Sequence, residues 1–153
     1  MNKNIYVIEK WLKSWLDYGR SNKNNFILPK ELEQFVKPNS INLYRGFSED
    51  YEIEKSILIN ELSSFTTDLN TAADFTTMDG KFYKYILKTD KPINVIEIKD
   101  IYFYLLNKCD LSKYQQLIIT EREFINIDKV ELTINNIRSE QLLTHKLNYI
   151  ESR

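Results

Sequence analysis

The chain has 153 residues, of which 42% are hydrophobic and 13% aromatic, and it contains only three glycines and three prolines. This composition predicts a single compact domain over residues 1–153 and excludes a disordered, collagen-like or linker-rich polypeptide. The 21 basic and 22 acidic side chains nearly balance, so charge does not imply nucleic acid as a partner, although it does not exclude nucleic acid as an acceptor.

The cysteine and histidine content argues against a metal site. Cys109 is the only cysteine and His145 the only histidine, so neither an internal disulfide, nor a zinc cluster, nor a catalytic imidazole is expected. Lys10, Lys13 and Asp17 interrupt the apolar N-terminal residues, and therefore neither a signal peptide nor a transmembrane segment is predicted. We expect a cytoplasmic protein without metal or membrane partner, and the cytoplasm of a bacterial host cell is included in that expectation.

The N-terminal part, residues 1–38, is predicted to be helical. Apolar residues recur there at helical spacing and predict an amphipathic helix from about residue 4 to 18, with Trp11 and Trp15 interpreted as its core packing. Pro29 at a first-turn position predicts a short second helix. Helices are therefore expected to precede the sheets.

Residues 41–135 are rich in β-branched and aromatic side chains and are predicted to form the sheets. Strands are expected at residues 41–47, 62–66, 81–87, 93–98, 117–127 and 130–134, and helical turns at 70–75 and 101–107. The last two strands are expected to form a hairpin across Asp128-Lys129. Residues 49–59 are predicted as a helix or an irregular connection, and residues 139–150 as a closing helix. Helices followed mainly by strands predict an α+β fold.

Three short segments carry residues suited to chemistry. They are Leu43-Tyr44-Arg45-Gly46-Phe47, the run from Ser63 to Phe75, and Glu121-Arg122-Glu123-Phe124-Ile125. In this order they resemble the arginine, serine and glutamate regions of the ADP-ribosyltransferase family. The resemblance is to the branch with a Glu-x-Glu pair, which includes arginine-specific mono-ADP-ribosyltransferases of phages and bacterial toxins.

The second segment carries much of this resemblance, because Ser64, Ala72 and Phe75 match the family's serine, alanine and phenylalanine in spacing. The resemblance covers roughly residues 41–127. It implies two packed, mostly antiparallel sheets that form an NAD cleft and are flanked by N-terminal helices. It also implies that NAD is the cosubstrate.

The two glutamates are expected to be the catalytic residues. By resemblance, Glu123 stabilises the positive charge that develops on the ribose when the bond to nicotinamide breaks. Glu121 is the candidate for positioning and deprotonating the acceptor. If both lie on one strand, their side chains emerge from the same face and point into one cleft.

The remaining site residues are expected to bind the dinucleotide. The chain has no glycine-rich phosphate loop, so the forked cation of Arg45 is expected to hold the diphosphate or its ribose. Gly46 is expected to allow the nicotinamide amide to approach the backbone. Ser64 is expected to hydrogen-bond Glu123, and Phe75 matches the family's aromatic residue that packs on the nicotinamide ring.

The function expected from this set is the transfer of ADP-ribose from NAD to an acceptor, foremost an arginine side chain of a protein. One alternative keeps the fold and changes the acceptor to water, as in an NAD glycohydrolase, or to a nucleic acid or small molecule. A second alternative is an inactive interaction module of the same fold, in which Arg45 and the glutamates merely cover a sheet. NAD turnover separates the enzymes from the module.

Overall fold

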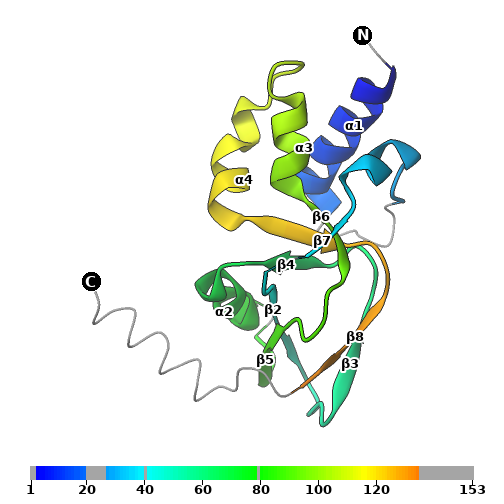
Figure 1. Cartoon of the computed structure of the whole chain (residues 1–153). Coiled ribbons are helices and arrows are strands. Elements are labelled where there is room, and N and C mark those ends of the chain that lie inside the picture. The colour runs from blue at the N-terminus through cyan, green and yellow to red at the C-terminus, as the bar shows by residue number, and fades with distance from the viewer. Residues whose placement is uncertain (1–2, 20–26, 40, 79, 135–153) are drawn as a thin grey trace.

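The computed structural model describes residues 3–19, 27–39, 41–78 and 80–134 and shows an α+β fold. Within these residues, three α-helices gather at one end of the molecule, and a further α-helix lies with the strands at the other (Figure 1). The predicted closing helix over residues 139–150 lies outside the described residues. Within the described residues, no helix has the length and apolar character needed to cross a membrane.

The helical elements follow from periodic apolar residues. In chain order they are α1 (Lys3–Ser14), the π-helical turn η1 (Trp15–Gly19), the 3-10 helix η3 (Lys30–Phe35), α2 (Leu69–Met78), α3 (Ile98–Leu105), the 3-10 turn η4 (Ser112–Tyr114) and α4 (Gln115–Glu121). The strands are β1 (Lys37–Pro38), β2 (Tyr44–Glu49), β3 (Ser56–Ile59), β4 (Ser64–Thr66), β5 (Tyr83–Lys88), β6 (Asn94–Glu97), β7 (Glu123–Asn126) and β8 (Val130–Thr133).

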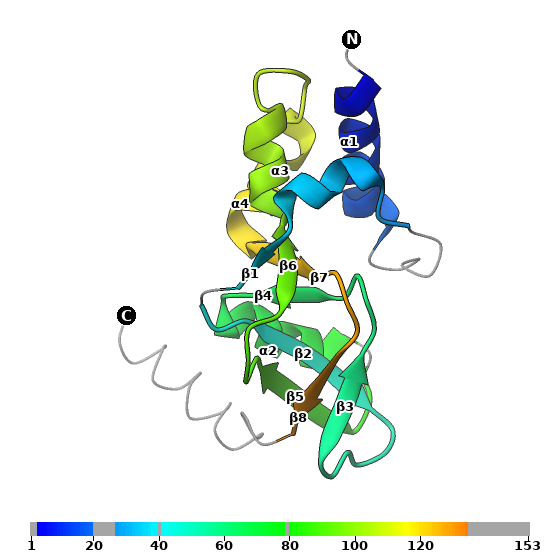
Figure 2. The ribbon, with the colours of Figure 1, turned by 45° about the vertical axis from the view of Figure 1, so that its right-hand side comes forward.

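The strands form two antiparallel sheets. The larger has the order β1-β6-β7-β4-β2-β5, and the smaller consists of β3 and β8. One core cluster contains side chains of both sheets, including Phe65 and Phe124 from the larger and Leu132 from the smaller, so the two sheets pack on each other. Figure 2 shows the β3–β8 pair beside β2 and β5.

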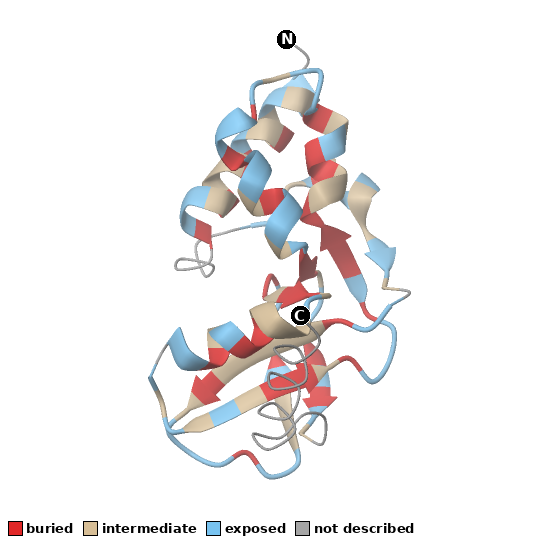
Figure 3. Ribbon diagram, turned by 90° about the vertical axis from the view of Figure 1, so that its left-hand side faces the viewer, coloured by how far each residue is buried: buried red, intermediate tan, exposed pale blue. Residues whose placement is uncertain are grey.

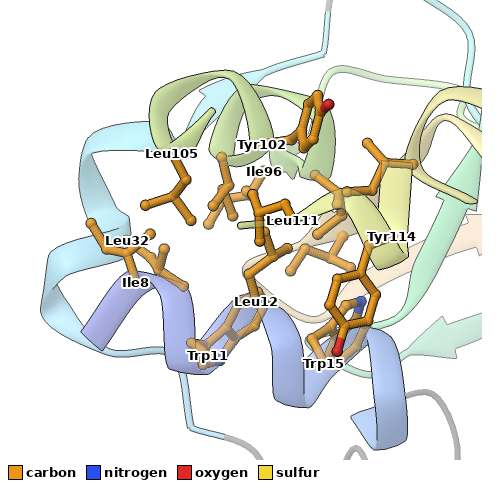
Figure 4. Packing of buried hydrophobic residues seen from close by; sticks show 14 of the residues in the cluster. Ile8, Trp11, Leu12, Trp15, Leu32, Ile96, Tyr102, Leu105, Leu111 and Tyr114 are labelled. Atoms are coloured by element: carbon orange, nitrogen blue, oxygen red, sulfur yellow. The ribbon is translucent and has the colours of Figure 1, made fainter. Parts of the chain in front are cut away.

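A second core cluster joins the N-terminal helical part to the sheet. Ile8 and Leu12 of α1, together with Trp15, are buried at helical spacing, which confirms the predicted amphipathic helix. They pack against α3, α4 and the β6–β7 region of the sheet (Figure 4). Buried residues accordingly line the facing sides of the helices and the strands beneath them (Figure 3). The helical part is thereby held directly against β7.

The predicted strand over residues 117–127 is confirmed only for Glu123–Asn126, and the predicted hairpin after it is wrong. Residues up to Glu121 form α4, because Tyr114 and Ile118 are buried at a spacing of four residues against the helical cluster. The strand β7 begins only at Glu123, and its two edges are occupied by β4 and β6. No edge of β7 is therefore left for β8, which instead pairs with β3 in the second sheet.

This pairing also corrects the prediction for residues 49–59. Ser56–Ile59 is strand β3 rather than a helix or irregular connection, and its partner is β8, more than 70 residues later in the chain. The apolar residues Ile57 and Ile59 alternate along it and pack in the core between the sheets. The short segment between Arg45 and Ser64 thus leaves the larger sheet, adds one strand to the smaller sheet, and returns.

Candidate active site

A cavity of about 310 Å³, a volume typical of small-molecule sites, lies between α2, the sheet and η1. It is lined by all six residues that the sequence analysis selected, namely Arg45, Gly46, Ser64, Phe75, Glu121 and Glu123. These residues come from β2, β4, α2, the end of α4 and the start of β7. The fold therefore brings together side chains that are up to 78 residues apart.

The cavity lies where β2 and β4 separate. The two strands share a single registered pair, Tyr44 with Thr66, although β2 continues for five more residues alongside β5. Residues of β2 after Tyr44 and residues before Thr66 in β4 both line the cavity. Divergence of two neighbouring strands thus opens the sheet at one place, and α2 covers that place.

Ser64 and Glu123 form the centre of the site. In the β4–β7 ladder Glu123 is opposite Thr66 and Ser64 is opposite Ile125, so Ser64 and Glu123 are diagonal neighbours on one face. The Ser64 hydroxyl donates a hydrogen bond to Oε2 of Glu123, which is the contact expected from the sequence. Only 6% of Glu123 is exposed. A buried carboxylate with a defined donor is a preorganised negative charge.

Trp15 is a site residue that the sequence analysis assigned to core packing alone. Its indole Nε1 donates to Oε2 of Glu123 at 3.2 Å, and the residue also belongs to the helical core cluster. One signal for this role is available from the sequence, since a buried indole N–H requires an acceptor. The identity of that acceptor depends on the tertiary structure, because Glu123 is 108 residues away.

Arg45 lies on β2, the other of the two diverging strands. Its Nη1 donates to the backbone oxygen of Ser64 at 2.9 Å, and burial lowers the pKa of its guanidinium from the ordinary value. The residue as a whole is half-buried and lines the cavity. Among the described residues, no carboxylate forms an ion pair with Arg45. A desolvated cation without a counter-charge is suited to an anionic ligand.

Glu121 lines the same cavity as Glu123, but the expected strand geometry is wrong. Glu121 is the last residue of α4 and Glu123 the first of β7, and Arg122 between them has a left-handed backbone with φ of 47°. The Thr66 hydroxyl donates to the backbone oxygen of Glu121 at 2.9 Å. A helix end, a left-handed residue and a strand start therefore replace the predicted continuous strand.

The side chain of Arg122 does not line the cavity and instead belongs to a group of charges beside β6. Its Nη2 lies 3.5 Å from Oε1 of Glu97, whose other oxygen is 3.1 Å from Nζ of Lys37. Hydrogen bonds to Asp100 and Glu97 raise the pKa of Lys37. The ion pair with Glu97, the buried centre of the group, connects the left-handed residue to the end of β6.

α2 brings Phe75 to the cavity. Asp68 caps the helix by accepting hydrogen bonds from the backbone N–H of Asn70 and the hydroxyl of Thr71. Thr71, Phe75 and Met78 line the cavity at helical spacing, so one face of α2 forms a wall. Phe75 is half-buried and keeps accessible surface for a ligand ring.

Gly46 has a structural role that was not expected from the sequence. A Cβ built at this position would lie 1.7 Å from the backbone oxygen of Ala72 and 2.6 Å from its carbonyl carbon. The missing side chain therefore makes room for α2, which packs directly on β2. Gly46 also lines the cavity, so helix–strand packing gives one reason for glycine here. The approach of a nicotinamide amide to its backbone stays a prediction.

Comparisons with known proteins do not identify this site. No family model, no curated protein and no solved structure matches the chain. Within the described residues, no group of three or more His, Cys, Asp or Glu side chains is arranged to hold a metal ion. The function is therefore inferred from the geometry of the cavity and from the resemblance described above.

Proposed function

We propose that the protein is a mono-ADP-ribosyltransferase that transfers ADP-ribose from NAD to an acceptor, foremost a protein arginine, and releases nicotinamide. The observation that carries this proposal is the composition of one cavity. It contains a buried carboxylate held by hydrogen bonds at Glu123 and a largely desolvated cation at Arg45 that forms no ion pair with any described residue. These groups are complementary to the two charged parts of the reacting dinucleotide, the developing ribose cation and the diphosphate.

In the proposed reaction Arg45 binds the diphosphate and Phe75 packs against the nicotinamide ring. The bond between ribose C1′ and the pyridinium nitrogen breaks, and its electron pair returns to that nitrogen, so neutral nicotinamide leaves. Glu123 stabilises the positive charge that develops on the ribose. A guanidinium nitrogen of the acceptor forms the new bond to C1′, and Glu121 receives the proton that this nitrogen loses.

The proposal is tested by incubating the protein with NAD labelled in its adenosine part, together with a protein extract, RNA and free arginine in separate reactions. Release of nicotinamide with label on protein, and mass spectrometry that places it on arginine, supports the proposal. Free labelled ADP-ribose would indicate an NAD glycohydrolase, and label on RNA or free arginine would indicate another acceptor. Absence of NAD consumption in every reaction would favour the interaction module.

Arg45 provides a test of dinucleotide binding. We expect Arg45→Gln to weaken NAD binding by about 10- to 100-fold, because a charge-assisted hydrogen bond is worth roughly 1.5–3 kcal/mol. Isothermal titration calorimetry measures this change. Arg45→Lys retains the charge but not the fork, so we expect an intermediate affinity. Lys84→Gln removes an exposed cation from β5 and is the control; equal affinities of Arg45→Gln and this control would contradict the assignment.

Glu121 provides a test of the acceptor step. Since its proposed role is to deprotonate the acceptor, we expect Glu121→Gln to lower transfer to arginine by about 10²- to 10⁴-fold. Hydrolysis of NAD, which needs Glu123 but no guanidinium acceptor, should change much less. Both rates are measured in one reaction as labelled protein and free ADP-ribose. A parallel loss of the two rates would show that Glu121 acts in NAD cleavage instead.

A further inference from the structure

Trp15 is the second hydrogen-bond donor to the carboxylate oxygen that Ser64 binds. Its Nε1 lies 3.2 Å from Oε2 of Glu123, and both residues are buried. The residue lines the cavity, yet only 1% of it is exposed. A ring with so little accessible surface cannot serve as a stacking platform for a ligand. What Trp15 contributes to the site is therefore its N–H group.

The ring of Trp15 is fixed by its surroundings. It stacks on Trp11 with 5.5 Å between ring centroids and 5° between planes. On another side, a Cβ added to Gly19 would lie 2.4 Å from Cε3 of Trp15, so the backbone of η1 closes directly over the ring. A donor whose orientation is determined by packing restricts the carboxylate to one position.

We infer that Trp15 is a positioning residue for Glu123, an inference that rests on the proposed function. Two donors from separate parts of the molecule converge on Oε2, Ser64 from β4 and Trp15 from the N-terminal helical part. Together they hold the negative charge of Glu123 where the ribose cation develops. The N-terminal helical part, which lies outside the residues 41–127 that carry the resemblance, thereby supplies one component of the proposed active site.

The test compares Trp15→Phe with Trp11→Phe, the same substitution at the residue four positions earlier. Both positions belong to one core cluster, but Trp11 does not line the cavity. We expect Trp15→Phe to lower kcat for nicotinamide release by about 10- to 100-fold. KM for NAD should be unchanged, because the buried ring offers no surface to the ligand. Trp11→Phe, which keeps a ring to stack on Trp15, should retain the wild-type kcat.

A second variant separates the loss of the N–H donor from a change in packing at position 15. Benzothienylalanine, a tryptophan analogue in which sulfur replaces the indole N–H, preserves the size of the ring and removes only the donor. We expect the same loss of kcat with this analogue, at a thermal unfolding temperature close to that of the wild type. A wild-type kcat for the analogue would overturn the inference alone. Absence of NAD turnover in the wild-type protein would overturn the proposed function, and the inference with it.

Discussion

Glu123→Gln is expected to lower the rate of NAD cleavage by about 10³-fold, which corresponds to roughly 4 kcal/mol of transition-state stabilisation. Glutamine has the same shape and keeps an oxygen that can accept the hydrogen bonds from Ser64 and Trp15. The substitution removes the negative charge and little else. Since that charge is proposed to act only as the ribose becomes cationic, NAD binding should change by no more than a few-fold.

The stability of this variant separates catalysis from folding. Burial of a carboxylate costs more than burial of an amide, and only 6% of Glu123 is exposed, so Glu123→Gln should unfold at the wild-type temperature or above it. Nicotinamide release measured by chromatography and thermal unfolding measured by calorimetry test the two expectations. The control is Glu131→Gln, which alters an exposed glutamate on β8. Cleavage by Glu123→Gln within ten-fold of that control would remove Glu123 from the mechanism.

The second large effect is expected at Gly46, on folding. In Gly46→Ala the new methyl group would overlap the backbone oxygen of Ala72, at 1.7 Å, and backbone atoms cannot move aside as a flexible side chain can. Overpacking of this kind costs about 3 kcal/mol, and more if α2 cannot shift. We therefore expect the unfolding temperature to fall by about 10 °C.

The same variant should also weaken NAD binding, because α2 carries the cavity wall that includes Thr71 and Phe75. Gly80→Ala is the matched control. Its backbone has a positive φ of 66°, but no atom lies within 4 Å of the added Cβ, so only backbone strain of about 1 kcal/mol is expected. Calorimetry measures the unfolding temperatures of the two variants, and we expect the lower one for Gly46→Ala because a steric overlap costs more than a strained backbone. Equal unfolding temperatures for Gly46→Ala and the wild type would show that α2 is not packed on β2 as described.

Local patterns in the sequence were sufficient for several parts of this protein. The spacing of Ile8, Leu12 and Trp15 predicted the first helix, since a helix buries every third or fourth residue whatever it packs against. The change to β-branched and aromatic residues after residue 41 predicted the α+β class. The strand expected at residues 62–66 and the helical turns expected at 70–75 are present as β4 and α2.

The arrangement of the two glutamates could not be obtained in this way. Ile118, Ile119 and Thr120 are β-branched and favour a strand when considered locally. Burial of Ile118 against the helical cluster makes this segment a helix, and the left-handed Arg122 ends the helix before Glu123 begins β7. Tertiary packing overrode a weak local preference here.

The sequence by itself determined the first helix, the α+β class and the chemical groups available to the site. Only the tertiary structure decided which strand pairs with which, that Gly46 makes room for α2, and that Trp15 donates to Glu123. Periodicity reports which side of an element is buried, whereas pairing depends on which strand edges are already occupied. The hydrogen bonds that Glu123 accepts likewise exist only after the chain has folded, because Ser64 is 59 and Trp15 is 108 positions away in the sequence.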